Sequence, residues 1–153
     1  MVMVDRNFGI DERALNHATL RHEGQVRKFN NEPYINHPKR VASNFVDPKT
    51  KAAAYLHDVL EDTAATEEEL REFFPDYVVD TVKILTKKSG ENYFDFIMRV
   101  KNDSNLDAIM IKLADINDNL RDLQEGSLKD KYRLAQYILQ QQLVTCQTFK
   151  VLK

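Results

Sequence analysis

The sequence of 153 residues has little of what membrane, secreted and nucleic-acid-binding proteins usually carry. Its single cysteine, Cys146, excludes an internal disulfide and indicates a reducing, cytoplasmic setting. No apolar run approaches the roughly 20 residues that span a bilayer, and Met1–Gly9 lacks the pattern of a signal peptide. The net charge is -2 without a basic block. We therefore expect neither a membrane partner nor a nucleic-acid partner.

Glycine and proline are also scarce, at four residues each, and they fall between periodic segments rather than inside them. Convincing strand alternation is missing, and no repeat or low-complexity tract is present. Hydrophobic residues make up 42% of the chain and charged residues 30%, which is typical of a folded domain. We predict one all-α domain over residues 1–153, a bundle of about seven to nine helices.

Local signals predict where several helices begin and end. Asp11 is a candidate N-cap of the first helix, and Gly24 is a candidate stop. Asp47-Pro48 predicts a second start, because proline is tolerated at the first helical position. Thr66–Glu69 has the pattern of a capping box, which predicts another helix. The stretch from Gln25 to Pro38 reads as a long loop, and long loops in compact domains are often functional.

The second half of the chain continues this pattern. Residues 77–86, YVVDTVKILT, are β-branched, so a helix is favoured there with a strand as the alternative. Residues 105–123 carry apolar side chains at helical spacing. Ser127 can cap a last helix that reaches about Phe149.

The segment YLHDVLEDT, residues 55–63, places an imidazole and three acids in an apolar stretch that reads as one helix. Residues four apart share a helix face, so His57 is predicted below Glu61, and Asp58 below Asp62. Buried carboxylates need compensation, and one divalent cation could satisfy several of them together with an imidazole. The alternative is an ordinary helix face whose acids are solvated.

Two other positions could complete such a coordination sphere. His37 stands just before Pro38, at the joint between the loop and a short helix. Asp115 follows Leu113 on the apolar side of the long helix, where a lone acid needs a partner. Either residue taken alone is compatible with a purely structural role. With His57 and Asp58 they make a set of two histidines and two aspartates, which several divalent metals accept.

Three strings, HEGQVRKFNNEPYINHPKRVA, AAAYLHDVLEDT and IKLADINDNLRDL, resemble the hydrolase domain of RelA/SpoT-type alarmone enzymes in the HD phosphohydrolase superfamily. In length the chain is most similar to the stand-alone small alarmone hydrolases, also called metazoan SpoT-like hydrolases. The resemblance covers Asn16 to about Tyr137. It implies an HD-domain helical bundle that binds one Mn²⁺ per chain, other divalent transition metals being alternatives.

The resemblance also implies roles for individual residues. The metal ligands would be His37, His57, Asp58 and Asp115. The hydrolytic chemistry would belong to Glu61 and Asp62. Substrate contacts would come from Arg27, Lys28, Asn119 and Tyr132, although on the sequence alone Arg27 and Lys28 read as solvated charges.

The implied activity is removal of the 3′-pyrophosphate from (p)ppGpp, or from adenosine counterparts, to give GDP or GTP and pyrophosphate. Asp118 departs from the family pattern, and we expect it next to the site, where it would affect base preference or phosphate tolerance. No synthetase segment follows, so we expect a one-way hydrolase. The alternatives are an HD phosphatase for another nucleotide, such as a nucleoside monophosphate or NADPH, a nucleotide sensor without turnover, and a helical structural protein. The pattern leaves the choice between a monomer and a homo-oligomer open.

Overall fold

The computed structural model describes residues 9–151 of the chain, with side chains for residues 9–147. This part contains nine α-helices, and its only strand-like pairing is an isolated bridge between Val26 and Pro33. The helices are α1 (Ile10–Arg21), α2 (Asn36–Ala42), α3 (Pro48–Leu56), α4 (Val59–Asp62), α5 (Glu67–Phe73), α6 (Asp76–Ile84), α7 (Tyr93–Asn102), α8 (Leu106–Asp122) and α9 (Ser127–Val151). The all-α prediction is confirmed.

Two further sequence predictions concern particular segments. The strand alternative for residues 77–86 is wrong, because α6 occupies most of that segment. The judgement on a signal peptide concerns the N-terminus, of which residues 1–8 lie outside the described residues. Among the described helices, none combines the length and the apolar character needed to cross a membrane.

The predicted helix starts agree with the observed caps at two places. The Asp47 side chain accepts hydrogen bonds from the backbone N–H groups of Lys49 and Thr50, at 2.7 and 3.2 Å, which satisfies donors that the helix leaves free. The Thr66 hydroxyl accepts from the N–H of Glu69 at 3.2 Å. The start predicted at Asp11 is off by two positions, because Gly9 is the N-cap of α1.

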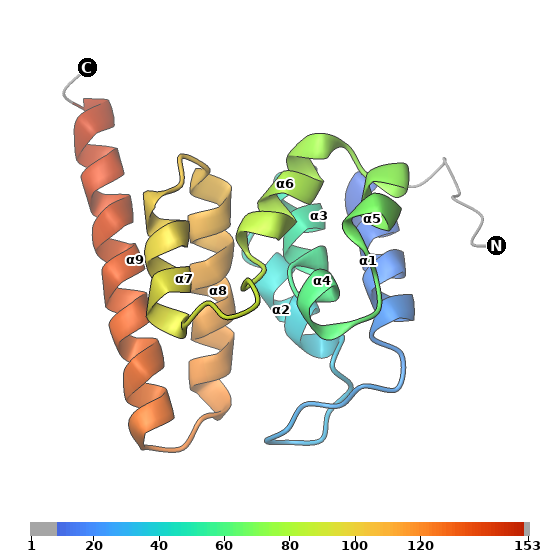
Figure 1. Ribbon diagram of the computed structural model, residues 1–153, viewed down its shortest axis with the longest axis horizontal. Coiled ribbons are helices and arrows are strands. Elements are labelled where there is room, and N and C mark those ends of the chain that lie inside the picture. Colours follow the sequence, from blue (N-terminus) through green and yellow to red (C-terminus); the bar gives the residue numbers. More distant parts are fainter. Residues whose placement is uncertain (1–8, 152–153) are drawn as a thin grey trace.

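The interior is formed by two hydrophobic clusters that share α8. The first cluster surrounds α3, against which α1, α2 and α6 pack. The second joins α7, α8 and α9. Ile111 of α8 belongs to the first cluster, and Ile109 and Ile116 belong to the second. Figure 1 shows the two groups of helices with α8 at their junction, so polar side chains of α8 can face both groups.

The sequence predicted one helix for the segment YLHDVLEDT, but the helix breaks at His57 and Asp58. α3 ends at Leu56, and α4 begins at Val59. The imidazole Nδ1 of His57 lies 2.7 Å from the carbonyl oxygen of Ala54, a carbonyl that a continuous helix would pair with a backbone N–H. The break leaves His57 and Asp58 side by side at the bend. Asp58 still lies one turn before Asp62, as predicted, because the N–H of Asp62 donates to the carbonyl of Asp58 at 2.9 Å.

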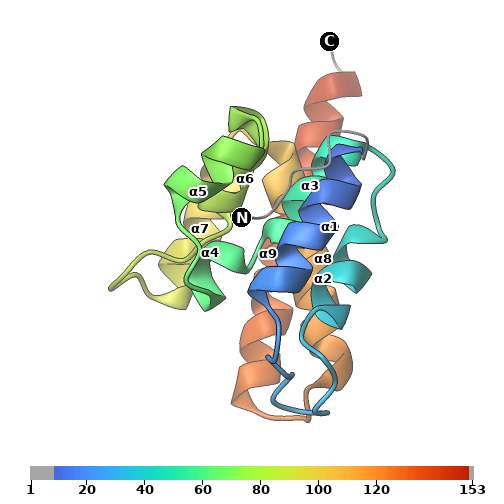
Figure 2. The same ribbon diagram turned by 90° about the vertical axis from the view of Figure 1, so that its right-hand side faces the viewer.

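The long loop before α2 is held by its own backbone. The N–H of Arg27 donates to the carbonyl of Glu32 at 2.9 Å, and the N–H of Tyr34 donates to the carbonyl of Gln25 at 2.8 Å. In both ribbon views this loop lies beside the turn between α8 and α9 (Figure 1, Figure 2). α2 begins before Pro38, so His37 lies in the first turn of a helix rather than in the loop.

Candidate metal centre and cavity

The structure brings together the two histidines and two aspartates that the sequence singled out. The Nε2 atom of His37 lies 3.0 Å from an oxygen of Asp115 and 3.5 Å from one of Asp58. The Nε2 atom of His57 lies 3.0 Å from Asp58 and 3.6 Å from Asp115. Ligand atoms about 2.1 Å from one ion, at right angles, would be about 3.0 Å apart. Ligand atoms of His37, His57 and Asp58 all lie within 4.8 Å of one another, so these three groups could share one divalent cation, and Asp115 lies beside them.

The orientation of both imidazoles supports this fit. The Nδ1 atom of each ring is occupied, by the carbonyl of Ala54 for His57 and by the carboxylate of Asp118 for His37. Each Nε2 atom therefore faces the two aspartates. In metal-binding histidines the ring nitrogen that does not bind the metal is usually hydrogen-bonded in this way. The Nε2 atom of His57 is buried, and despite its closeness to Asp58 it makes no well-aligned hydrogen bond among the described residues. A cation would supply a partner for this atom.

The electrostatics of the cluster require positive charge. Burial lowers the pKa of His37, but hydrogen bonds to Asp115, Asp118 and Asp58 outweigh it and raise that pKa to about 11. Burial also lowers the pKa of His57, but the neighbouring aspartates outweigh it and raise that pKa to about 9. A divalent cation could replace these protons, because it would balance the same carboxylates.

Glu61 and Asp62 lie next to this cluster, on α4. Carboxylate oxygens of Asp58, Glu61 and Asp62 all lie within 4.8 Å of one another. Burial and the charge of Asp58 raise the pKa of Glu61, and the same two causes raise that of Asp62. The backbone N–H of Lys87 donates to Glu61 at 2.9 Å. A raised pKa makes a carboxylate a stronger base than usual, which suits both groups to proton transfer.

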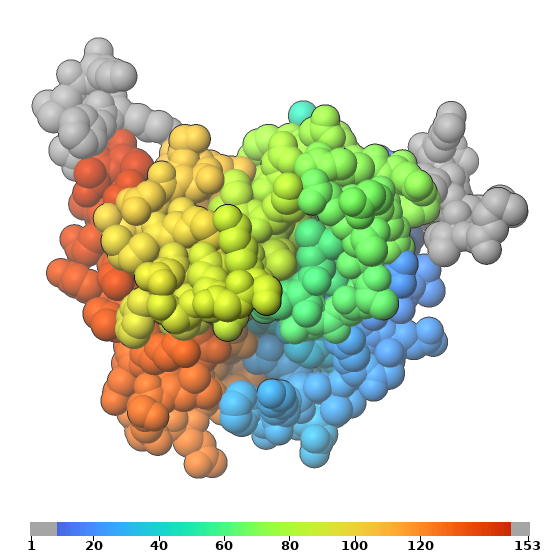
Figure 3. Space-filling view, viewed as in Figure 1, coloured from blue at the N-terminus to red at the C-terminus, as the bar shows by residue number. Residues whose placement is uncertain are grey.

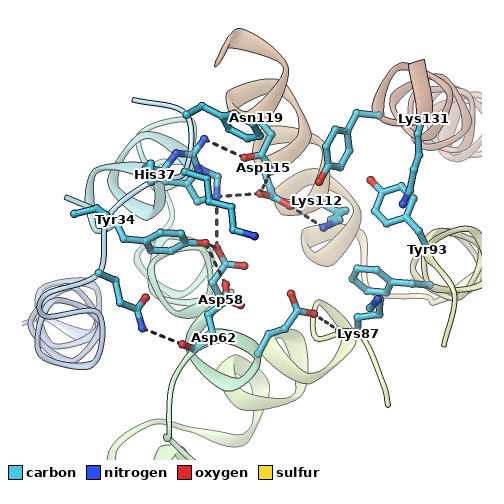
Figure 4. Close-up of a pocket in the computed structure, with 18 residues that line it drawn as sticks. Tyr34, His37, Asp58, Asp62, Lys87, Tyr93, Lys112, Asp115, Asn119 and Lys131 are labelled. Atoms are coloured by element: carbon cyan, nitrogen blue, oxygen red, sulfur yellow. Dashed lines mark hydrogen bonds and ion pairs between the residues drawn. The ribbon is translucent and has the colours of Figure 1, made fainter. Parts of the chain in front are cut away.

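The cluster opens into a cavity of about 670 Å³, a volume within the range of small-molecule sites. Figure 3 shows the surface hollowed between the blue and orange parts of the chain. The close-up in Figure 4 shows Asp58 and Asp62 on one side, with Lys87, Tyr93 and Lys131 across from them. One wall is therefore acidic, and the opposite wall is basic and aromatic.

All four predicted substrate residues line this cavity. Arg27 is buried, and it donates a hydrogen bond to the side-chain oxygen of Asn119 at 3.1 Å. The amide of Asn119 in turn donates to Asp115 at 3.0 Å. Lys28 is exposed at the rim, and the ring of Tyr132 meets that of Tyr93 edge-on, with centroids 5.4 Å apart.

Several lining residues escaped the sequence reasoning. Lys112 donates to Asp115 at 2.7 Å, a contact that the spacing of three residues on one helix could have revealed. The hydroxyl of Tyr34, in the quoted motif PYINHP, donates to Asp58 at 2.6 Å. Lys87 and Lys131 come from distant segments, and no local pattern marks them.

Asp118 lies next to the site, as the sequence suggested, and it contacts His37. It does not line the cavity itself. Its carboxylate is buried behind His37, 2.6 Å from Nδ1 of that ring, and it also accepts from Arg40 at 2.6 Å. His37 and Arg40 both belong to α2, so these two contacts hold the Asp118 carboxylate toward that helix.

Comparison with known families assigns the chain to a class. The family model described as HD domain matches residues 14–106, more than half of the chain. The chain therefore belongs to the HD domain family. The resemblance to RelA/SpoT-type proteins is also confirmed, by the named relatives and by a solved structure.

Two curated relatives are bacterial. The chain is 35% identical over 153 residues to the GTP pyrophosphokinase of Myxococcus xanthus, covering 88% of this chain and 20% of that protein. It is 41% identical over 128 residues to the bifunctional (p)ppGpp synthase/hydrolase SpoT of Escherichia coli (strain K12), covering 73% and 18%. The chain thus spans about a fifth of the length of these relatives.

The solved structure is described as a metazoan ortholog of SpoT that hydrolyzes ppGpp and plays a role in starvation responses. It matches with a TM-score of 0.75 and 29% identity, covering 89% of this chain and 86% of that chain. The agreement extends over nearly the whole of both chains, so the two share a fold at comparable size.

Proposed function

We propose that this chain is a metal-dependent hydrolase that removes the 3′-pyrophosphate from (p)ppGpp or its adenosine counterparts. The observation that carries the proposal is the opening of the His/Asp cluster, with Glu61 and Asp62 beside it, into a cavity whose far wall is basic. The names of the relatives point to the same substrate. Cys146 as the single cysteine supports a cytoplasmic setting.

The metal would be held by His37, His57, Asp58 and Asp115, and we propose Mn²⁺ as the native ion. When bound, such an ion lowers the pKa of a coordinated water and polarises a phosphoryl oxygen. Two neutral imidazoles and two carboxylates balance its charge. Lys112, which donates to Asp115, fixes the orientation of one of these carboxylates.

Glu61 and Asp62 would manage the protons of the reaction. Water adds to the phosphorus atom that is bonded to the 3′ oxygen. The bond between this phosphorus and the 3′ oxygen breaks, and the 3′ oxygen takes up a proton. Glu61 would orient the attacking water and accept its proton, since a raised pKa makes it a stronger base than an ordinary glutamate. Asp62 would supply the proton to the leaving oxygen. The N–H of Lys87 would keep Glu61 directed into the cavity.

The remaining lining residues suit a highly charged nucleotide. Lys87 and Lys131 offer ammonium groups to phosphates across the cavity from the acids. Tyr93, Phe96 and Tyr132 offer aromatic surface. Arg27 and Lys28 enter from the loop, and Asn119 lies between Arg27 and the metal cluster. We assign Arg27, Lys28, Asn119 and Tyr132 to substrate binding.

The test is to incubate purified protein with ppGpp, with Mn²⁺ or with a chelator, and to separate the products by chromatography. GDP and pyrophosphate formed only with Mn²⁺ would support both the metal and the 3′ cleavage. Tight binding of ppGpp without turnover would instead make the protein a nucleotide sensor. Turnover of a nucleoside monophosphate or of NADPH, but not of ppGpp, would replace the substrate and keep the site.

A further inference from the structure

Asp118 is a buried acid that neither lines the cavity nor belongs to the four proposed metal ligands. Its side chain is 7% exposed, and it lies on α8 one turn after Asp115. One carboxylate oxygen, Oδ2, lies 2.6 Å from Nδ1 of His37, on the side of that ring away from the metal cluster. Asp118 therefore contacts the cluster only through the imidazole of His37.

Arg40 holds the other side of this carboxylate. Its Nε donates to Oδ1 of Asp118 at 2.6 Å, and its Nη2 donates to Oδ2 at 3.1 Å. The same guanidinium donates to Glu32 at 2.6 and 3.1 Å. A two-pronged contact with arginine fixes both the plane and the charge of a carboxylate. Asp118 is thus presented to His37 as an acceptor, and Nδ1 of His37 must carry the proton.

From this geometry we infer that Asp118 is a positioning residue for the metal ligand His37, and that Arg40 holds Asp118 in that role. The pair keeps the proton of His37 on Nδ1, leaves the Nε2 lone pair toward Asp58 and Asp115, and makes Nε2 a stronger donor to a divalent cation. This inference rests on the metal site of the proposed function, but not on the identity of the nucleotide.

The second histidine provides an internal comparison. His57 is oriented by a neutral backbone carbonyl, that of Ala54 at 2.7 Å. His37 is oriented by a carboxylate that is itself paired with arginine. A carboxylate acceptor increases the basicity of an imidazole more than a carbonyl does. His37 is therefore expected to contribute more than His57 to metal affinity, and that surplus should disappear when Asp118 loses its charge.

The experiment measures Mn²⁺ affinity of the metal-free protein by competition with a chelating dye, with no nucleotide present. Asp118→Asn keeps the shape of the side chain but removes its charge, and we expect affinity to fall roughly 10- to 100-fold. Arg40→Gln should cause a smaller loss in the same direction. Asp107→Asn is the matched control, since Asp107 lies on the same helix and accepts hydrogen bonds from Thr50 and Tyr77 outside the site.

Wild-type affinity in Asp118→Asn would overturn the inference. So would equal losses in Asp118→Asn and Asp107→Asn, because these would reflect general damage to α8. If Asp118→Asn does not fold, nitrogen-15 NMR of the zinc-loaded wild-type protein decides: a proton on Nδ1 of His37 supports the inference, and a proton on Nε2 overturns it. A protein that binds metal in this way but leaves ppGpp intact would refute the proposed substrate while the inference stands.

Discussion

The hydroxyl of Tyr34 donates a hydrogen bond to the carboxylate of Asp58, with the two oxygens 2.6 Å apart. The same hydroxyl lies 3.2 Å from an oxygen of Asp62. Tyr34 thus connects a proposed metal ligand with a proposed proton donor, and it does so from the end of the long loop. The side-chain amide of Gln25, in the same loop, donates to the backbone carbonyl of Asp62 at 2.9 Å. The loop therefore fixes the acids as well as lining the cavity.

Replacing Tyr34 by phenylalanine should slow the reaction. The variant keeps the ring, which packs against His22 and His37, but it removes the donor shared by the two acids. Loss of such an outer contact typically costs about 10- to 100-fold in metal affinity or activity. The measurement is ppGpp turnover at saturating Mn²⁺. Tyr77→Phe removes a hydroxyl that bonds to Asp107 outside the site, and it should retain turnover. Turnover of Tyr34→Phe within twofold of wild type would contradict the prediction.

Glu61→Gln should separate chemistry from metal binding. The amide preserves the size of the side chain but cannot accept a proton, so turnover should fall by about 10²- to 10⁴-fold. Metal content, measured by elemental analysis, should stay at one ion per chain, because Glu61 is not among the four proposed ligands. Glu68→Gln, on the exposed side of α5, is the control for loss of one carboxylate. Loss of the metal in Glu61→Gln would make Glu61 a ligand instead.

Much of the helical framework was predictable because its signals are local. The caps at Asp47 and Thr66 are satisfied within three residues along the chain, so sequence spacing reveals them. The break at His57 was missed because it depends on an imidazole that turns back to the carbonyl of Ala54. Nothing in the spacing of YLHDVLEDT distinguishes that bend from a continuous helix.

The residues of the site likewise divide into those that the sequence marked and those that it did not. His57, Asp58 and Asp115 were marked as polar residues in apolar surroundings, His37 by its place at the joint between loop and helix, and all four by the resemblance to a known family. The basic wall was missed, because Lys87 and Lys131 reach the cavity from a loop and a helix that meet only in the folded chain. The contacts of Asp118 behind His37 could not be predicted for a related reason. Its partner Arg40 lies 78 positions away in the sequence, and only the packing of α2 against α8 brings them together.

Metal binding should stabilise the fold, and Asp58 should be needed for this. The two aspartates and two histidines face one another at 3.0 to 3.6 Å, so a cation relieves the repulsion between the carboxylates. An ion present at 100 times its dissociation constant adds about 2.7 kcal/mol to the free energy of unfolding. Thermal unfolding with and without Mn²⁺ measures this gain. Asp58→Ala should abolish it, whereas Asp130→Ala, on the surface of α9, should keep it. An unchanged midpoint on adding Mn²⁺ to the wild type would contradict a metal site.

The loop that carries Lys87 is fastened by Arg99 and Glu91. Arg99 donates to the carbonyls of Ile84 and Thr86 at 2.9 and 3.0 Å, and to the carboxylate of Glu91 at 2.8 and 3.0 Å. The hydrogen bonds from Arg99 are the largest cause that lowers the pKa of Glu91, from 4.5 to about 2. A carboxyl group with a depressed pKa stabilises the folded state above its unfolded pKa, and this contribution is lost as the pH falls through the folded value.

The contribution of Glu91 to the free energy of unfolding should therefore decrease as the pH falls from about 4.5 to about 2. In this range Glu91 is protonated in the unfolded chain but still ionised in the folded one. Glu91→Gln removes this contribution, so it should be less stable than wild type at pH 7, and the difference should narrow as the pH falls through that window. Urea unfolding at a series of pH values measures both stabilities. A difference that stays constant down to pH 2 would show that the Glu91–Arg99 pair does not depend on ionisation.

Because Lys87 holds Glu61 through its backbone N–H, the variant Glu91→Gln should also lower turnover at neutral pH while leaving Mn²⁺ affinity unchanged.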